Sequence, residues 1–528
     1  MAGKSDHAVD ISKAMVVEPV ALGDMLVIAP ICITIIAGAL LLMFRKNISL
    51  HPTLAFLALA GLVVSNSALV MRIMDTGPIT MTMGRWLPPF GISFSVDLLG
   101  ATLTLIASVV ALAVSIYAAI DIDKVGRRYG FYPFLMLLMT GVSGAFLTGD
   151  IFNLYVWFEV LLISSFGLIV LGSEKVQLDG AVKYALLNLI ATTLFLVATG
   201  YLYGTLGTLN MADITIKVSK LDDTAPINTI AALYALAFAM KAAAFPVNFW
   251  LPASYHTPRI VVSAVFAGLL TKVGVYALLR TLVMIMPAAR DQYADILLFV
   301  AIFTMLAGVL GALAQNDVRR LLGYLVISGI GSMMAGVALG EQLGLSGAIL
   351  YAIHSIIVMT GLYLALGVVM RLSGGRYNLA ELGGAYQASS YLSAIFIVLA
   401  FAVAGLPPFS GFWPKVMLVS AALDAEQNLL AGVILLAGLL TSIAIFRVWA
   451  HAFWRSGPIG TPDGNDGPAL EPVARSDRWS LYLPVTVLTG IVIALGVWPE
   501  PVFQVAGSSA LGLIHPGDYL SSVFGGAR

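Results

Sequence analysis

Five ionisable side chains lie inside stretches of sequence that are otherwise apolar. Glu159 lies in NLYVWFEVLLISSFG, Lys241 in YALAFAMKAAAFP and Lys272 in SAVFAGLLTKVGVYALLR. His354 is in the middle of a further apolar stretch, and Lys415 directly follows GLPPFSGFWP. A charge at the centre of a bilayer costs about 2.5–3.5 kcal/mol on insertion scales, and such charges usually mark proton or ion pathways.

The chemistry that these residues can perform together is proton relay. A lysine between apolar surroundings and a movable carboxylate can bind a proton and release it as the carboxylate moves. We predict that Glu159 is the partner of Lys241 and that Lys272, His354 and Lys415 continue the relay. The alternatives are a static ion pair, lysines that extend to the membrane surface, and a histidine that is only hydrogen-bonded.

Two of the stretches that carry lysines run into proline-rich turns. FPVNFWLP contains Pro246, and GLPPFSGFWP contains Pro407 and Pro408. A proline inside a helix removes an amide donor and frees a carbonyl about four residues earlier, and in lipid that carbonyl must be packed in protein or hydrated. We predict broken membrane helices here, with an ordinary proline kink as the alternative.

The composition is that of a polytopic membrane protein. Of the 528 residues, 59% are hydrophobic and 11% are charged, against roughly 45–50% and 25% in soluble domains. A membrane-spanning helix needs about 20 residues, and the alternating pattern of a membrane barrel is absent. We therefore predict an all-α polytopic membrane protein with about fourteen transmembrane helices. The predicted spans are residues 25–44, 53–71, 97–120, 130–148, 151–171, 181–205, 227–245, 258–280, 294–314, 320–339, 344–370, 388–422, 428–450 and 479–498.

Lysine and arginine in the loops predict the orientation in the membrane. The loops after odd-numbered spans carry more of them, among them Arg45, Lys124 and Arg319, than the loops after even-numbered spans. We therefore predict that odd-numbered loops are cytoplasmic and that both termini are external. The longest loop, 451–478, is rich in glycine, proline and aspartate and is predicted to be irregular.

An internal repeat relates two parts of the chain. Residues 180–200 match 347–367, and residues 237–252 match 400–415, both without a gap. The matched spans are five apart, an odd number, so the two copies cross the membrane in opposite directions. We predict two inverted five-helix repeats, spans 4–8 and 9–13, with broken helices at spans 7 and 12, as in secondary transporters; chance similarity is the alternative. The predicted segments are 1–127 (spans 1–3), 128–285 (first repeat), 286–452 (second repeat) and 453–528 (cytoplasmic loop and last span).

Signatures of other chemistry are missing from the sequence. It has no P-loop, no GxGxxG after a strand and no histidines at metal-ligand spacing, so we predict no metal and no cofactor. The single cysteine, Cys32, excludes a disulfide within the chain, and 28 basic against 28 acidic residues give no basic footprint for nucleic acid. Lys183 with Asp179, and His256, are candidate supporting residues, although Lys183 is also suited to the membrane interface.

Several motifs resemble the antiporter-like family shared by respiratory complex I and the multisubunit Mrp cation/proton antiporters. They are NLYVWFEVLLISS (153–165), residues 241–280, DVRRLLGYLVIS (317–328) and GLPPFSGFWPK (405–415), and the similarity covers essentially the whole chain. The turn WLPASYHTP and the ending 500–520 are similar to the D-type subunits of the antiporters. The complex I members usually have an Asp-Ala-His turn after WLP.

The resemblance implies a hydrated polar axis along which protons move. In it Glu159 corresponds to the family's span-5 glutamate and Lys241 to its span-7 lysine. Lys272 corresponds to the span-8 relay lysine, and Lys415 to the span-12 lysine or glutamate.

The chain departs from the family between Lys272 and Lys415. Many relatives have a histidine within the stretch that reads Ser328–Gly329 here, and a lysine in place of Met359. We hypothesise that water, His354 and hydroxyl groups bridge the gap; the alternative is a path that leaves through a partner subunit. The hydroxyl candidates are Ser328, Thr360 and Tyr363.

We predict a membrane subunit of a multisubunit monovalent cation/proton antiporter that relays protons to drive Na⁺ or K⁺ efflux. Its expected partners are a large A-type subunit and small hydrophobic subunits, and its expected location is the bacterial plasma (inner) membrane. The alternative is a proton-pumping membrane subunit of complex I or a related energy-converting oxidoreductase. A third interpretation is a subunit that only scaffolds its neighbours. In each case the chain is a transport or structural subunit and not itself an enzyme.

Overall fold

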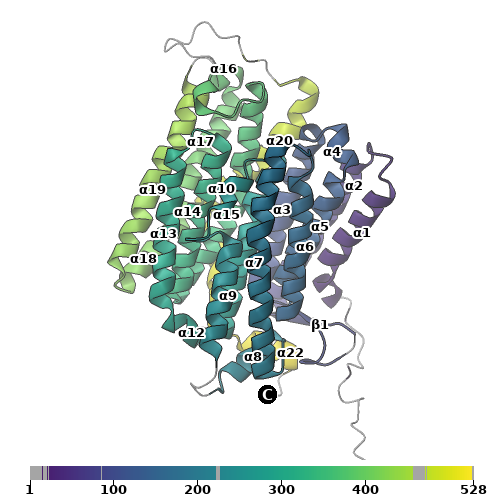
Figure 1. The fold of residues 1–528 in the computed structure, drawn as a ribbon, viewed down its shortest axis with the longest axis vertical. Coiled ribbons are helices and arrows are strands. Elements are labelled where there is room, and N and C mark those ends of the chain that lie inside the picture. Colours follow the sequence, from purple (N-terminus) through teal and green to yellow (C-terminus); the bar gives the residue numbers. More distant parts are fainter. Residues whose placement is uncertain are drawn as a thin grey trace, which may run out of the picture.

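The computed structural model describes Met15, Ala21 and residues 23–84, 86–221, 226–455, 470 and 473–525. In these ranges the chain is a bundle of helices, most of which run between the two ends of the molecule (Figure 1). One hairpin is formed by β1 (Ile79–Thr82) and β2 (Ser93–Val96), which pair antiparallel with Ile79 opposite Val96. The glycine-rich segment of the long loop, residues 456–469, lies outside the described residues.

The first part of the bundle packs around the hairpin. Two of its membrane helices begin at capping aspartates, Asp97 and Asp150, whose carboxylates accept amide hydrogens of the first turns of α3 and α6. The elements are η2 (Asp24–Val27), α1 (Ala29–Met43), α2 (His51–Thr76), α3 (Leu98–Asp121), α4 (Lys124–Arg128), α5 (Phe131–Leu147), α6 (Ile151–Ile169), α7 (Lys175–Leu206), α8 (Met211–Val218), α9 (Ile227–Ala242), α10 (Trp250–Ser254), α11 (Ile260–Leu278) and the π-helical η3 (Leu279–Ile285).

The second part continues the bundle and returns the chain to the hairpin, because α22 packs against β1 and β2. Thr80 of β1 shares a hydrogen bond with Ser522 of α22 at 2.9 Å. The elements are α12 (Pro287–Gln292), α13 (Ala294–Ala314), α14 (Val318–Leu339), α15 (Gln342–Leu372), η4 (Leu379–Glu381), α16 (Ala385–Ala388), α17 (Ser390–Ala404), α18 (Phe412–Asp424), α19 (Asn428–Trp449), the π-helical η5 (Ala450–Trp454), α20 (Arg475–Val497), α21 (Glu500–Ile514) and α22 (Gly517–Phe524).

Ten helices in the described ranges are long and apolar enough to cross a membrane. They coincide with ten of the fourteen predicted spans, so the chain is a mostly helical, multi-pass membrane protein. The other predicted spans coincide with four shorter apolar helices, α1, α5, α9 and α17. At 1.5 Å per residue these helices alone do not reach across about 30 Å of hydrocarbon, so the number fourteen stays a prediction.

Burial separates the central helices from the peripheral ones. The most apolar 18-residue windows of α11, α14 and α15 are 100%, 94% and 94% buried, whereas that of α2 is 28% buried. The central helices therefore contact other helices on all sides, and any polar group on them faces protein.

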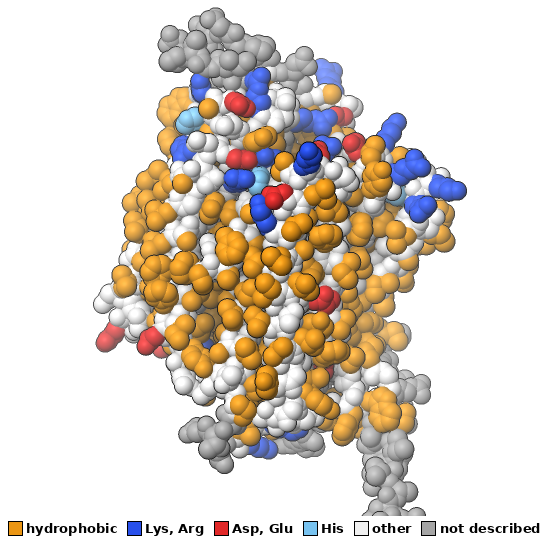
Figure 2. Space-filling model, viewed as in Figure 1, with side chains coloured by type: hydrophobic (Ala, Val, Ile, Leu, Met, Phe, Trp, Pro, Cys, Tyr) orange, Lys and Arg blue, Asp and Glu red, His pale blue; other side chains and the backbone are white. Residues whose placement is uncertain are grey.

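The two ends of the molecule differ in charge. Figure 2 shows lysine and arginine side chains gathered at the end where α4 and α16 lie, and hydrophobic side chains over the middle of this face. The hairpin, α8, α12 and α22 lie at the opposite end (Figure 1).

Candidate proton pathway

Lys241 and Glu159 do not form the ion pair that we predicted from the sequence. In the described part of the chain no ion pair joins them: the Lys241 ammonium lies over the Phe158 ring, 5.3 Å from its centroid. Oε1 of Glu159 is buried without a hydrogen-bond partner, although the residue as a whole is half-buried. Phe158 therefore stands beside the cation where a carboxylate was expected, and the glutamate retains an unused acceptor.

Lys241 is placed at the end of a half-helix. It is the second-last residue of α9, and helix geometry resumes only at Trp250 of α10. The indole of Trp250 donates to the carbonyl of Met240 at 3.0 Å, and the amide of Phe245 donates to Thr304 at 2.9 Å. These bonds satisfy backbone groups at the break, while the C-terminal end of a helix favours a cation such as Lys241.

Lys272 lies on the fully buried helix α11 and is 1% exposed. Its ammonium donates to the carbonyl of Ala267 at 2.6 Å, with no acidic partner in the described residues. α11 passes close to the end of α9, since a Cβ at Gly274 would lie 2.7 Å from the amide nitrogen of Ala242. Only glycine permits this approach, which brings the helix that carries Lys272 against the helix that carries Lys241.

His354 contacts the second helix break through a residue that we had not singled out. Its Nδ1 lies 2.8 Å from the hydroxyl of Ser410, and both residues are buried. Ser410 belongs to the segment between α17 and α18, and a Cβ at the next residue, Gly411, would lie 2.9 Å from the imidazole. The only advance signal was the small polar residue inside the sequence PPFSGF.

Lys415 is held by the carbonyl oxygens that the prolines were predicted to free. Its ammonium donates to Ala404 at 2.6 Å and approaches Val403 at 3.5 Å. These carbonyls are four residues before Pro408 and Pro407, as the loss of amide donors requires. Ala404 is also the residue that the internal match places opposite Lys241.

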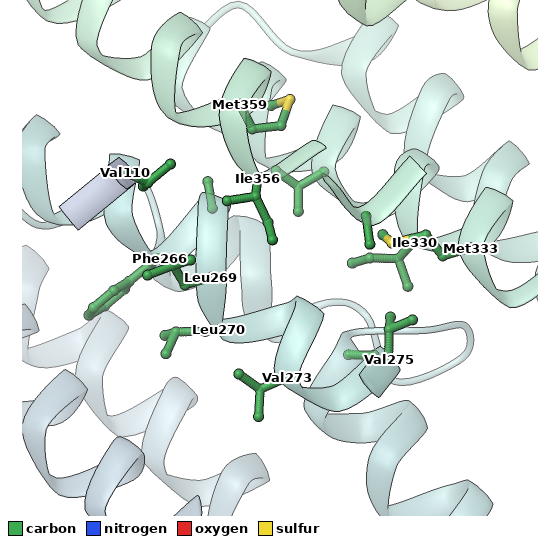
Figure 3. Packing of buried hydrophobic residues seen from close by; sticks show 14 of the residues in the cluster. Val110, Phe266, Leu269, Leu270, Val273, Val275, Ile330, Met333, Ile356 and Met359 are labelled. Atoms are coloured by element: carbon green, nitrogen blue, oxygen red, sulfur yellow. The ribbon is translucent and has the colours of Figure 1, made fainter. Parts of the chain in front are cut away.

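Hydrophobic side chains fill much of the space around Lys272. Figure 3 shows side chains of α11, α14 and α15 in this region, among them Val273, Met333, Ile356 and Met359. Met359 is 1% exposed. Thr360, one turn of α15 from Ile356, donates to the carbonyl of Ala264 on α11 at 3.2 Å and to Ile356 at 2.9 Å.

The other predicted hydroxyl groups lie on the same central helices but differ in direction. Ser328 is buried on α14. The hydroxyl of Tyr363 donates to the carbonyl of Arg319 at 3.0 Å, in the first turn of α14. Tyr363 is therefore engaged at a helix end and does not bridge the central lysines.

The candidate supporting residues lie outside the central pathway. Lys183 and Asp179 form an ion pair at 2.5 Å on the exposed face of α7, with 52% and 64% of the side chains exposed. Nδ1 of His256 lies 2.9 Å from the carbonyl of Pro252 and therefore carries the hydrogen, so Nε2 accepts from Arg320 at 3.0 Å. Burial, and then the Arg320 charge, lower the pKa of His256 to about 4. His256 is thus a neutral acceptor that fixes Arg320 at the basic end.

A buried ion pair, Asp97 with Arg280, was not predicted from the sequence. Arg280 is 1% exposed at the end of the span that carries Lys272, and it donates to Asp97 at 2.5 Å. It also donates to the hydroxyl of Tyr276 at 3.0 Å and lies over the rings of Tyr276 and Tyr519. The available signal was an aspartate directly before an apolar run, which is a helix N-cap pattern.

Comparisons with known proteins agree with this architecture. Residues 148–441 match the family model described as NADH:quinone oxidoreductase/Mrp antiporter, TM. The D subunit of the Na⁺/H⁺ antiporter of Alkalihalophilus pseudofirmus is 39% identical over 498 residues, which are 94% of this chain and 99% of that protein. The corresponding D subunit of Bacillus subtilis is 34% identical, over 94% and 99% of the two chains.

Solved structures give the same result at the level of the fold. A chain of the Mrp complex from Dietzia sp. superposes with a TM-score of 0.86 and 28% identity, over 96% of this chain and 100% of that chain. A chain of respiratory complex I from Thermus thermophilus superposes with a TM-score of 0.77 over 93% and 100% of the two chains, and its 24% identity supports a likeness of fold alone. The chain therefore belongs to the NADH:quinone oxidoreductase/Mrp antiporter family.

Proposed function

We propose that this protein is the D-type subunit of a multisubunit Mrp antiporter that exchanges Na⁺ or K⁺ for protons across the bacterial plasma membrane. The relatives that match nearly its whole length are D subunits of Na⁺/H⁺ antiporters. It is a membrane subunit of a hetero-oligomeric transporter, and its proposed partners are the large A-type subunit and the small hydrophobic subunits. Its own contribution is a proton relay through Glu159, Lys241, Lys272, His354 and Lys415.

The observation that carries the relay is the position of two ammonium groups at two helix breaks. Lys241 ends α9, while Lys415 reaches back from α18 to the carbonyl of Ala404, the counterpart of position 241. Two different residues thus place an ammonium group, that of Lys241 buried and that of Lys415 half-buried, at corresponding half-helix ends. Purely structural lysines have no reason to be retained at such cost in both places.

Contacts that recur at corresponding positions support the inverted repeat. Asp150 caps α6, and its backbone forms an isolated antiparallel bridge with Asn210. Asp317, 167 residues later, caps α14, and its backbone forms the same kind of bridge with Asn378. The hydroxyl of Tyr184 shares a hydrogen bond with that of Ser165 at 2.6 Å. Tyr351 is hydrogen-bonded to Ser332, and each of these two residues lies 167 positions after its counterpart. We propose repeats over 128–285 and 286–452, between the segments 1–127 and 453–528.

The proposed orientation follows the basic end of the molecule. Lysine and arginine gather where α4 and α16 lie (Figure 2), which on the positive-inside rule is the cytoplasmic end. Both termini are then external. We expect the helix breaks at Pro246, Pro407 and Pro408 to lie within the membrane, where the discontinuous helices of inverted-repeat transporters bind ions.

Cation/proton exchange in vesicles that carry the whole complex tests the relay. Lys241→Ala is expected to abolish Na⁺- and K⁺-driven proton movement while all subunits still copurify. Lys183→Ala, at an exposed ion pair, serves as the matched control with wild-type exchange. Full exchange by a Lys241→Ala complex would show that the buried charges are structural. Copurification with iron–sulfur redox subunits would favour the oxidoreductase alternative.

A further inference from the structure

A cavity of about 320 Å³, lined by apolar and by oxygen-bearing residues, lies at the end of the molecule opposite to the basic end. It is formed where α2 ends and α3 begins, and where α21 and α22 close the chain. The ending 500–520, which resembles D-type subunits, thus forms one wall, although the proton relay does not use it. The oxygen-bearing lining includes Asp97, Gln504, Ser508, Ser509, Asp518 and Tyr519.

Ser509 indicates that the cavity is built for a ligand. The residue is 3% exposed, and its hydroxyl oxygen is buried without a hydrogen-bond partner. A buried polar group that lacks a partner costs about 1–3 kcal/mol. Because Ser509 lines the cavity, a species inside the cavity can supply the missing interaction.

Asp97 offers a carboxylate oxygen to the same cavity. Its hydrogen bonds from Gly100, at 3.0 Å, and from Arg280, at 2.5 Å, both end on Oδ1. Its side chain is 10% exposed, while that of Arg280 is 1% exposed. The cavity therefore receives Oδ2 of the aspartate, and the guanidinium is sealed behind it.

The charge and the size of the cavity select its ligand. Asp97 and Asp518 of the lining contribute two negative charges, the adjacent Arg280 contributes one positive charge, and His515 also lines the cavity. Oxygen donors suit hard cations. In the described residues no three His, Cys, Asp or Glu side chains converge to hold a metal ion, and the cavity has room for several water molecules. A partly hydrated cation fits these conditions, and the proposed antiport identifies it as a monovalent one.

We propose that this cavity is an external binding site for the monovalent cation of the antiport. This inference rests on the proposed function and adds a cation site to the chain that carries the proton relay. Arg280 connects the two, because it lies eight residues, or about 12 Å of helix, after Lys272 on the same span. A cation near Asp97 competes with Arg280 for the carboxylate and thereby acts on the helix that carries a relay lysine.

Two glycines of α21 provide a matched test. A Cβ at Gly512 or at Gly507 would meet nothing within 4 Å, but only Gly512 lines the cavity. In vesicles with the whole complex, Gly512→Leu is expected to raise the KM for Na⁺ or K⁺ about tenfold, because the leucine side chain fills part of the cavity, with unchanged exchange at saturating cation. Gly507→Leu is expected to keep the wild-type KM.

Removal of a ligand charge provides the second variant. Asp518→Asn leaves the Asp97–Arg280 pair intact and is expected to raise the same KM, whereas Asp295→Asn, an exposed aspartate at the same end outside the cavity, is not. The site is refuted if Gly512→Leu and Asp518→Asn both keep the wild-type KM for Na⁺ and for K⁺. If these two variants keep the wild-type KM while Lys241→Ala loses exchange, the cation site is rejected and the proton relay is retained. Raised KM values with full exchange in Lys241→Ala would instead reject the relay and retain the cavity.

Discussion

The two helix breaks present an ammonium group at similar places but hold it differently. At the first break Lys241 belongs to the half-helix that ends there, and an aromatic ring and a nearby glutamate surround it. At the second break Lys415 comes from the half-helix that begins there and donates to the carbonyl of Ala404. The same electrostatic position, the C-terminal end of a half-helix, is filled from opposite sides of the break.

The surroundings of the two ammonium groups differ further. Position 326 of the second proposed repeat, 167 residues after Glu159, is the fully buried Val326. Conversely, the contact of His354 with Ser410 corresponds to Leu187 and Val247 in the first repeat. One half thus has an acid next to the ring that contacts its lysine, and the other has an imidazole and a hydroxyl at its break. Inverted symmetry fixes where the chain breaks, while single side chains decide which group can exchange a proton there.

The largest effect in this comparison is expected when Lys415 is removed, and a new lysine at position 404 is expected to reverse part of it. Lys415→Ala is expected to lower exchange about 100-fold, as for the loss of a group that transfers protons. The double variant Ala404→Lys/Lys415→Ala is expected to recover part of that loss, because its ammonium starts from the counterpart of position 241. Exchange rates of the purified complex in vesicles measure both. A double variant no better than the single one would contradict the equivalence of the two positions.

A smaller loss of exchange is expected when His354 in the second repeat is replaced by the residue at the corresponding position of the first repeat. His354→Leu, which copies Leu187, is expected to lower exchange about tenfold, the result of forcing protons through water and hydroxyls alone. Ser410→Ala is expected to act in the same direction with a smaller loss. Unchanged exchange in His354→Leu would mean that the path avoids His354, and a partner subunit would then be the exit.

The capping aspartates predict a difference in pH dependence of stability. Burial raises the pKa of Asp150 to about 6 from 3.8, despite amide hydrogen bonds from Asn153 and Phe152. Between these two pKa values the folded protein keeps a proton on Asp150 that the unfolded chain releases. The contribution of protonated Asp150 to the stability of the fold is therefore fully present below about pH 4 and is lost as the pH rises through 6.

Asp150→Asn retains the cap and is expected to be more stable than wild type by about 1–2 kcal/mol at pH 8, with no difference at pH 4. Thermal unfolding in detergent measures this. Asp317→Asn, which removes a part-exposed pair with Arg319, is expected to change stability by about 1 kcal/mol or less. Equal effects of the two variants at pH 8 would contradict the assignment of the pH dependence to Asp150.

The smallest effect concerns the residue that ends each half-helix. Ala243 and Gly405 both have positive φ, 62° and 83°, a conformation that costs a non-glycine residue about 1–2 kcal/mol. Ala243→Gly is expected to raise the stability by about 1 kcal/mol or less, since added freedom of the unfolded chain offsets part of the relief. Gly405→Ala is expected to destabilise, because its Cβ would lie 2.5 Å from Lys415. Thermal unfolding of the two variants measures both changes, and a less stable Ala243→Gly would contradict the expected relief.

Much of the fold could be predicted because the bilayer restricts the chain to few solutions. The fourteen apolar stretches coincide with helices or helix pairs at nearly the predicted bounds, ten of them long enough to span. Prolines at 246, 407 and 408 marked the interruptions. The partners of the charged groups could not be predicted, because a contact such as that of His354 with Ser410 joins residues 56 positions apart.

The sequence by itself determined the membrane class, the helix breaks, the family and the positions of Lys241, Lys272 and Lys415, since all of these follow from apolar length, proline chemistry and local motifs. Only the tertiary structure decided what each charge contacts. It replaced the predicted Glu159–Lys241 pair with a ring contact, gave Lys415 the carbonyl of Ala404, and joined Asp97 to Arg280 beneath a cavity. The physical reason is that a buried ion takes whatever donor or acceptor the packing brings within about 3 Å, and packing is set by the whole bundle.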